Sequence, residues 1–252
     1  MLKIVEHRDV EEERKMTDIK FKEVLDTITE NDMRELAEEL IKTIPTYFYD
    51  VPASSTGKYH PSYALGIGGL YLHTLALCRI MNHILEVSNY TDHDKNLMRI
   101  AGMMHDTRKS GSQEAYEKNK YTNFDHPLQA AEVVRNFKGK DWNDEDIEII
   151  ASAIETHMGK WNEDKRSNVI LPIPKNKYQM IVHWCDYLAS RKDIEVQFSN
   201  ESIEVPTIDT YRLSFGKHAG KLLSEIPKDY LQWLSTTDLK EPLRSLVKEV
   251  VG

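Results

Sequence analysis

The sequence is poor in cysteine, in long apolar runs and in basic charge. Only Cys78 and Cys185 occur among 252 residues, far apart, which excludes a disulfide framework and a zinc site made of thiolates. No run approaches the roughly 18 apolar residues of a membrane-spanning helix, and residues 1–18 are too charged for a signal peptide. The net charge of −8, from 33 Lys and Arg against 41 Asp and Glu, argues against broad, charge-driven binding of nucleic acid. These absences predict a cytoplasmic protein without membrane contact.

What the sequence has is helical patterning. With 40% hydrophobic and 29% charged residues, the chain has enough apolar content for a sizeable core. After a charged leader at 1–17, apolar residues recur at helical spacing, which predicts helices within 18–44 and over 69–86, 94–106, 127–137, 144–157 and 176–191. Gly159 is suited to end the fourth of these long helices. We therefore predict an all-α domain over residues 18–198, with a long connection at 47–69.

The pattern changes after residue 198. Residues 202–215 carry apolar side chains in an arrangement that indicates extended structure, and a glycine-containing turn follows at 216–220. Helices are expected from Lys228 and from Lys240. We predict a small α+β module over 199–252, which docks on the main domain because so short a segment has little core of its own.

The ten histidines require an explanation. The dipeptide His-Asp occurs twice, and its context differs between the two places. His93-Asp94 follows a polar turn, which we interpret as a solvated loop. His105-Asp106 ends an apolar stripe, and a polar pair directed into a core needs hydrogen-bond partners or a metal.

Further ionisable side chains share the placement of His105 and Asp106 on the apolar face or at the end of a predicted helix. The complete set of candidate metal ligands is His73, His105, Asp106, His126, His157 and Asp186. Packing alone does not require such a set, whereas divalent transition metals prefer a mixed shell of imidazole and carboxylate. The sequence therefore predicts a metal site.

The ligand set resembles that of the HD superfamily of phosphohydrolases. In this resemblance His73, His105-Asp106 and Asp186 match the metal-ligand series, and His126 and His157 match the histidines that two-metal members insert. Four stretches resemble more specifically the HD domain of bacterial 3′-to-5′ exoribonucleases that carry an OB-fold: 51–53 (VPA), 68–75 (GGLYLHTL), 156–159 (THMG) and 182–189 (VHWCDYLA). Residues 215–221 and 226–234 resemble a small module of unsettled role, which occurs alone or attached to exonuclease domains.

The resemblance implies an HD-type helical bundle that binds one or two divalent ions of Mn, Fe, Ni, Co, Zn or Mg. Asp106 would bridge the two ions, with His73, His105 and Asp186 at one of them and His126 and His157 at the other. Such ions produce a nucleophile from water near neutral pH and neutralise phosphate charge. Lys109, three residues after Asp106, would act as a catalytic residue by stabilising charge on the phosphoryl oxygens.

Positive charge near the ligands predicts an anionic substrate. Residues 158–177 contain five Lys or Arg against two acidic residues. Predicted substrate contacts are His60, Tyr63, Arg108 and Lys160. His183 is interpreted as a supporting or packing residue, because Asp186 one turn later takes the ligand position.

We predict a metal-dependent phosphohydrolase that cleaves phosphodiester bonds of an oligonucleotide or a nucleic-acid 3′ end. Its partner would be a nucleotide or a single-stranded nucleic acid. The alternative is a nucleotide or dNTP phosphohydrolase. The acidic net charge favours it, and so does the leader, which is too short for an OB-fold. Two further candidates are a cyclic-nucleotide phosphodiesterase and a binding protein with a relic metal site. Because the same ligands bind several metals, the sequence does not identify the metal. It does not indicate the oligomeric state either.

Overall fold

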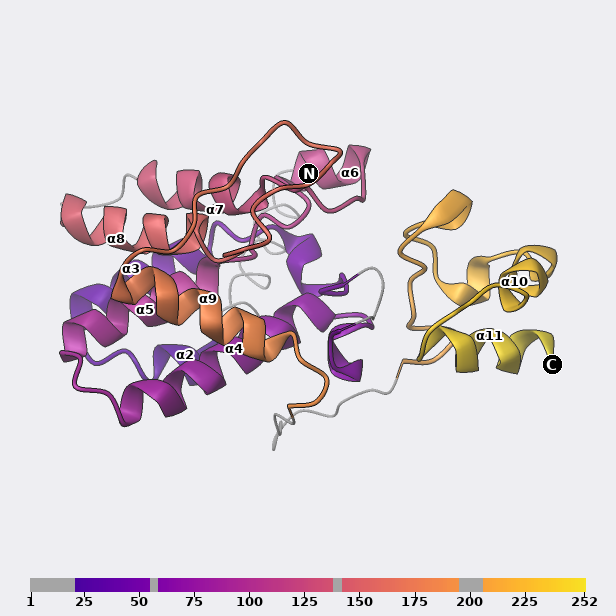
Figure 1. The fold of residues 1–252 in the computed structure, drawn as a ribbon, viewed down its shortest axis with the longest axis horizontal. Helices are drawn as coiled ribbons and strands as arrows, with labels where there is room; N and C mark the ends of the chain where they lie inside the picture. Colours follow the sequence, from indigo (N-terminus) through magenta and orange to yellow (C-terminus); the bar gives the residue numbers. More distant parts are fainter. Residues whose placement is uncertain (1–20, 55–58, 138–141, 195–205) are drawn as a thin grey trace, which may run out of the picture. The chain divides into compact units, whose positions relative to one another are not determined.

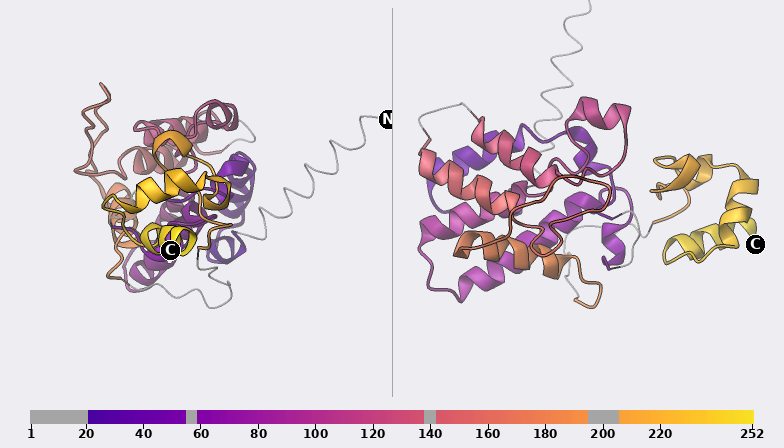
Figure 2. Two further views of the ribbon diagram at one scale, coloured as in Figure 1. Left: turned by 90° about the vertical axis from the view of Figure 1, so that its right-hand side faces the viewer. Right: turned by 45° about the horizontal axis from the view of Figure 1, so that its top comes forward.

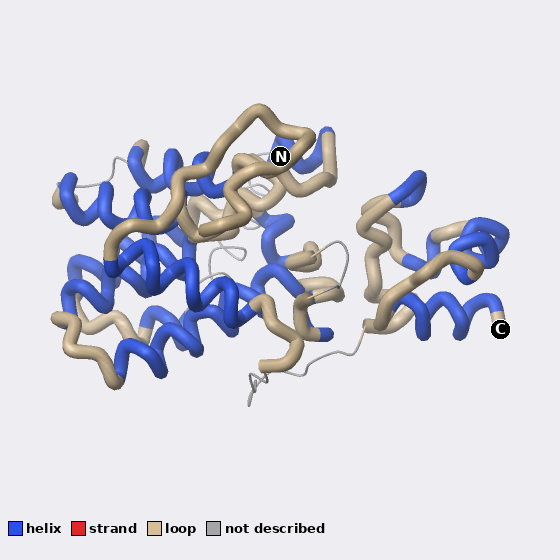
Figure 3. The backbone as a smooth tube through the Cα atoms, viewed as in Figure 1, coloured by secondary structure: helices blue, strands red, loops and turns tan. Residues whose placement is uncertain are grey.

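The computed structural model describes residues 21–54, 59–137, 142–194 and 206–252. Within these ranges the only regular structure is helical, with two isolated β-bridges and no strand (Figure 3). The α-helices are α2 (Lys22–Leu25), α3 (Asn31–Ile41), α4 (Gly69–Glu86), α5 (Asp92–Met104), α6 (Gln113–Lys118), α7 (His126–Arg135), α8 (Asp144–Glu155), α9 (Lys177–Ala189), α10 (Lys228–Ser235) and α11 (Leu243–Val251). Short 3₁₀ helices are η1 (Thr46–Tyr49), η2 (Ser62–Ala64), η3 (Gly216–His218) and η4 (Leu223–Glu225). The predicted leader at 1–17 lies outside the described residues.

The chain forms two compact units, each assembled from segments distant in sequence. The first combines Met1–Ile44, Met81–Arg108 and Phe124–Cys185, and the second combines Pro45–Ile80, Lys109–Asn123 and Asp186–Gly252. Helices α4 and α9 each supply residues to both units.

In the first unit, α8 packs against both α5 and α7, and α3 packs against α5 (Figure 1). Fully buried residues recur at helical spacing, such as Leu36 and Leu40 in α3 and Ile150 and Ile154 in α8. The prediction of a mainly helical domain is confirmed. Apolar stripes produce this packing because residues three and four apart lie on one face of a helix.

Local hydrogen bonds set the ends of α5 and α8. At the start of α5, the Thr91 hydroxyl accepts from the Asp94 amide at 3.1 Å, and the Asp94 carboxylate accepts from the Thr91 amide at 3.4 Å. This capping box starts the helix two residues earlier than predicted. Helix α8 ends at Glu155 with Thr156 as its C-cap, two residues earlier than predicted. Gly159, which we expected to end it, lies in the turn that follows: its φ is 56°, and its amide donates to the Thr156 carbonyl at 3.0 Å.

His93 lies in the first turn of α5, and its interpretation as part of a solvated loop is wrong. Its Nδ1 lies 2.8 Å from Oε2 of Glu30, and its Nε2 lies 3.0 Å from Oδ1 of Asp146. Both ring nitrogens donate only when the imidazole is protonated. The hydrogen bonds to Asp146 and then to Glu30 therefore raise the pKa of His93. The ring connects the beginnings of α3, α5 and α8.

Replacing His93 with glutamine is expected to lower the melting temperature most at mildly acidic pH. A pKa that is higher in the folded state stabilises the fold fully below the unfolded value of about 6.5, and this contribution is lost as pH rises through the folded value. The difference in melting temperature between wild type and His93→Gln should therefore shrink from pH 6 to pH 9. His83→Gln is the control, because its ring on α4 is 83% exposed and 3.9 Å from Glu86. A difference that stays constant with pH would contradict a role for the imidazolium charge.

In the second unit, Tyr47 organises the residues around η1. Its hydroxyl donates to the Gly111 carbonyl at 2.8 Å and accepts from the Ser110 amide at 3.0 Å, and its ring stacks on Tyr116 at 4.4 Å between centroids. Tyr116 belongs to α6, a helix that sequence periodicity did not predict. The connection that we expected at 47–69 contains η1 and η2.

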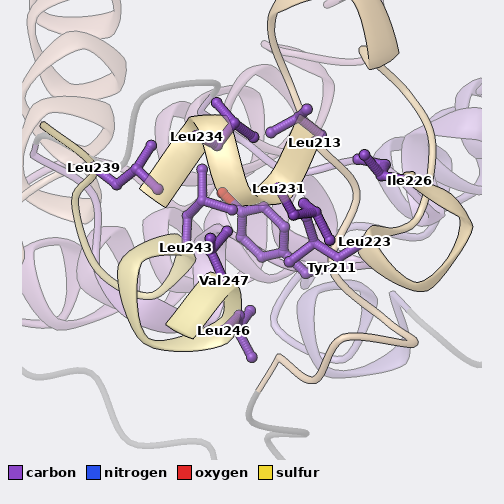
Figure 4. Packing of buried hydrophobic residues seen from close by; sticks show 10 residues of the cluster. All are labelled: Tyr211, Leu213, Leu223, Ile226, Leu231, Leu234, Leu239, Leu243, Leu246 and Val247. Carbon is purple, nitrogen blue, oxygen red and sulfur yellow. The ribbon is translucent and has the colours of Figure 1, made fainter. Parts of the chain in front are cut away.

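The prediction of an α+β module at the C-terminus is wrong for the described residues 206–252. They contain α10, α11, η3 and η4, and a single bridge between Arg212 and Leu222 takes the place of a strand. The Tyr211 ring lies among leucines and a valine from the two helices (Figure 4). Helices α10 and α11, drawn in yellow, pack against each other (Figure 2). This segment thus has its own buried cluster: Tyr211, Leu213, Leu223, Ile226, Leu231, Leu234, Leu239, Leu243, Leu246 and Val247.

In the part of the chain that the structure describes, we find no helix with the length and apolar character needed to cross a bilayer.

Candidate metal centre

The predicted ligands lie at helix ends or inside helices, and five of the six are buried. His105 and Asp106 directly follow α5, His126 begins α7, and His157 comes two residues after α8. In α4 and α9 the predicted ligands are His73, which is buried, and Asp186, which is partly exposed.

Asp106, His126 and His157 form a compact group within the first unit. Each offers one ligand atom, and these atoms lie within 4.8 Å of one another. Oδ1 of Asp106 is 2.9 Å from Nε2 of His126 and 3.5 Å from Nε2 of His157. Two imidazole nitrogens therefore converge on one carboxylate oxygen, at separations that suit a shared cation.

Backbone hydrogen bonds define the tautomers of two of these histidines. Nδ1 of His105 donates to the Gly102 carbonyl at 2.8 Å, and Nδ1 of His157 donates to the Ile154 carbonyl at 2.8 Å. A neutral imidazole has one N–H, so each Nε2 keeps the lone pair that a metal ion requires. Nε2 of His105 lies 3.5 Å from Oδ2 of Asp106. The donor set fits a divalent transition metal.

In the second unit, His73 and Asp186 are paired. Nε2 of His73 lies 2.9 Å from Oδ1 of Asp186, and the ring of His60 lies 5.4 Å from the ring of His73 between centroids. The structure thus brings His60, a predicted substrate contact, beside a predicted ligand.

Three other residues that we predicted to bind substrate or to act in catalysis are Tyr63, Arg108 and Lys109. Burial raises the pKa of Tyr63 to about 12. Arg108 donates from Nη2 to the Thr43 carbonyl at 2.9 Å, so part of its guanidinium binds the protein itself. The Lys109 carbonyl accepts from the Asn123 amide at 2.8 Å. The functional roles of these side chains stay predictions.

The loop after His157 contains Trp161, which sequence analysis did not single out, and it lies close to His183, which we interpreted as a supporting or packing residue. Nζ of Lys160 lies 4.8 Å from the centre of the Trp161 ring, and Nδ1 of His183 donates to the His157 carbonyl at 2.6 Å. The latter contact gives His183 a supporting position behind a candidate ligand. The sequence offered one signal for Trp161: a tryptophan next to a lysine, four residues after a predicted ligand.

Comparison with known proteins agrees with this geometry. Residues 70–191 match the family model of the HD domain, and residues 202–242 match that of a putative quorum-sensing-regulated virulence factor. No curated protein and no solved structure matches the chain. The HD match spans all six predicted ligands and supports the HD superfamily for this segment, which indicates a metal-dependent hydrolase of that superfamily.

Proposed function

We propose that this protein is a metal-dependent phosphohydrolase that cleaves phosphodiester bonds at the 3′ end of an oligonucleotide. The observation that carries the proposal is the buried group of Asp106, His126 and His157 inside the segment that matches the HD domain. The resemblance of residues 51–53, 68–75, 156–159 and 182–189 to exoribonuclease HD domains supports the substrate class. The positive charge of residues 158–177 supports it independently.

The chain's own residues would prepare a cation site and direct an anion towards it. The Asp106 carboxylate supplies negative charge in a buried place, where it attracts a cation more strongly than at the surface. The Gly102 and Ile154 carbonyls orient the rings of His105 and His157. When bound, a divalent ion lowers the pKa of its water and neutralises phosphate charge. Lys160 and its basic neighbours would attract the phosphates of the substrate.

Hydrolysis of nucleotides or dNTPs is a second candidate. The net charge of −8 favours it, because an acidic protein binds long polyanions weakly. Hydrolysis of a cyclic nucleotide would use the same phosphodiester chemistry at the same site.

The test is to follow products from 5′-labelled RNA and DNA oligonucleotides with Mn²⁺, with a dNTP mixture and cyclic nucleotides assayed in parallel. We expect a ladder that shortens from the 3′ end and disappears when EDTA is added. Intact oligonucleotides together with converted dNTPs, or with opened cyclic nucleotides, would overturn the proposal in favour of the corresponding activity. No conversion of any of these substrates would overturn all three.

A further inference from the structure

We propose that Trp161, together with Lys160 and His183, forms a stacking platform for a nucleobase of the substrate next to the candidate metal centre. This inference rests on the proposed function, because it requires a nucleotide substrate. All three residues belong to the first unit, as do Asp106, His126 and His157.

Short-range backbone contacts define the position of Trp161. The Gly159 amide donates to the Thr156 carbonyl at 3.0 Å, and the Trp161 amide donates to the Met158 carbonyl at 3.1 Å. Trp161 is therefore placed by two consecutive turns that begin at the end of α8, directly around His157. The remainder of the loop, drawn in orange between α8 and α9 in Figure 1, also has contacts of its own.

These further contacts close the base of the loop. The Leu171 amide donates to the Asn162 carbonyl at 2.9 Å, and Nδ2 of Asn162 donates to the Leu171 carbonyl at 3.2 Å. An isolated β-bridge joins Glu163 to Ile170. Because the segment that follows Trp161 is cross-linked in this way, the indole has a defined place relative to His157.

His183 connects the indole to the candidate ligand. Its Nδ1 donates to the His157 carbonyl, and its ring lies 6.4 Å from the Trp161 ring between centroids, at an angle of 54°. The His183 ring also lies directly against Gly159, where a Cβ would lie 2.1 Å from Cε1 of His183. The His183 imidazole thus bonds to the main chain of the candidate ligand His157 and lies near the exposed indole of Trp161.

The chemistry of this surface fits a nucleobase and its phosphate. The Trp161 side chain is 43% exposed, which is large for a tryptophan, and Nζ of Lys160 lies 4.8 Å from the ring centre. Bases of any sequence stack on an indole, and a neighbouring ammonium group attracts the attached phosphate. The excess of Lys and Arg in residues 158–177 favours this occupant over an apolar protein partner, although Ile170 and Ile173 are also exposed.

The first test compares two oligonucleotides that differ only in whether the 3′-terminal residue carries a base or is abasic. Wild type should prefer the complete oligonucleotide. Trp161→Ala should lower kcat/KM for it about tenfold, mainly through KM, and leave the abasic substrate unchanged. Trp161→Phe should keep most of the preference. Trp184→Ala is the matched control, because Trp184 is 50% exposed on α9 in the same unit and should not affect the preference.

The second test detects binding without turnover. Titration of the full chain with dAMP should quench tryptophan fluorescence, and Trp161→Phe should remove the quenching while Trp184→Phe keeps it. If the oligonucleotides are cleaved but neither the preference for a 3′-terminal base nor the fluorescence quenching depends on Trp161, the platform is overturned. The proposed function is then left intact. Quenching that depends on Trp161 without oligonucleotide cleavage would support the base site and overturn the proposed reaction. An equal loss on both oligonucleotides in Trp161→Ala would indicate a structural role and overturn the inference.

Discussion

Replacing Asp106 with asparagine is expected to lower metal-dependent turnover by about a thousandfold or more, since a metal ion contributes several kcal/mol of charge stabilisation. Asparagine has the shape of aspartate, so the packing around this buried position is preserved. It lacks the negative charge that lies between His126 and His157 and that would offset the charge of a bound cation. The substitution is therefore expected to weaken metal binding strongly while the protein still folds.

Two readouts check this result without relying on the substrate. The metal content of the purified protein should fall, and added Mn²⁺ should no longer raise the melting temperature, because only binding to the folded state stabilises it. Asp92→Asn is the control, because Asp92 begins α5, the helix that Asp106 follows, and its carboxylate is 73% exposed. An Asp106→Asn protein that keeps its metal and its response to Mn²⁺ would show that Asp106 is not a ligand.

Gly159→Ala is expected to destabilise the protein by about 3 kcal/mol, from a backbone cost of about 1–2 kcal/mol and a steric cost of similar size. The backbone cost arises because φ at this position is 56°. The steric cost arises because a Cβ would lie 2.1 Å from Cε1 and 2.5 Å from Nε2 of the His183 ring. A displaced His183 would also release the His157 carbonyl, so metal content should fall together with stability.

Gly68→Ala separates the two causes. Gly68 has a φ of 74°, but the nearest atom to its added Cβ, the Tyr49 carbonyl oxygen, is 3.4 Å away. It should therefore show the backbone cost alone, about 1–2 kcal/mol in the free energy of unfolding measured with urea. Adding His183→Ala to Gly159→Ala should recover the steric part. If Gly159→Ala is no more destabilising than Gly68→Ala, the contact with His183 does not limit this position.

Much of the helical framework and the candidate ligand set could be predicted, because both depend on short-range patterns. The predicted helix 69–86 coincides with α4, and Gly159 has the positive φ that glycine favours in the turn after α8. Asp106 and His157 were noticed because polar groups on or at the end of apolar stripes need a partner once they are buried. His126 was noticed because it lies at the start of a predicted helix, just before Pro127.

The errors occur where a side chain's partner is distant in sequence or its packing surface is ambiguous. His93 finds Glu30 and Asp146, which are 63 and 53 positions away, so its polar surroundings in the sequence were misleading. Tyr211 and Leu213 were assigned to extended structure because of their apolar spacing. They flank a single β-bridge between Arg212 and Leu222 and form no strand, and they are buried in one cluster with leucines of α10 and α11.

The amino-acid sequence by itself determined the helical class of the main domain and which residues are candidates to bind a metal, because periodicity and helix-end signals act over a few residues. Only the tertiary structure decided which atoms meet. It directs Nε2 of His126 and His157 towards one oxygen of Asp106, and it places His183 against the His157 carbonyl, 26 positions away in sequence. Contacts of this kind depend on how whole helices pack, and that packing is a property of the entire core, which no local pattern encodes.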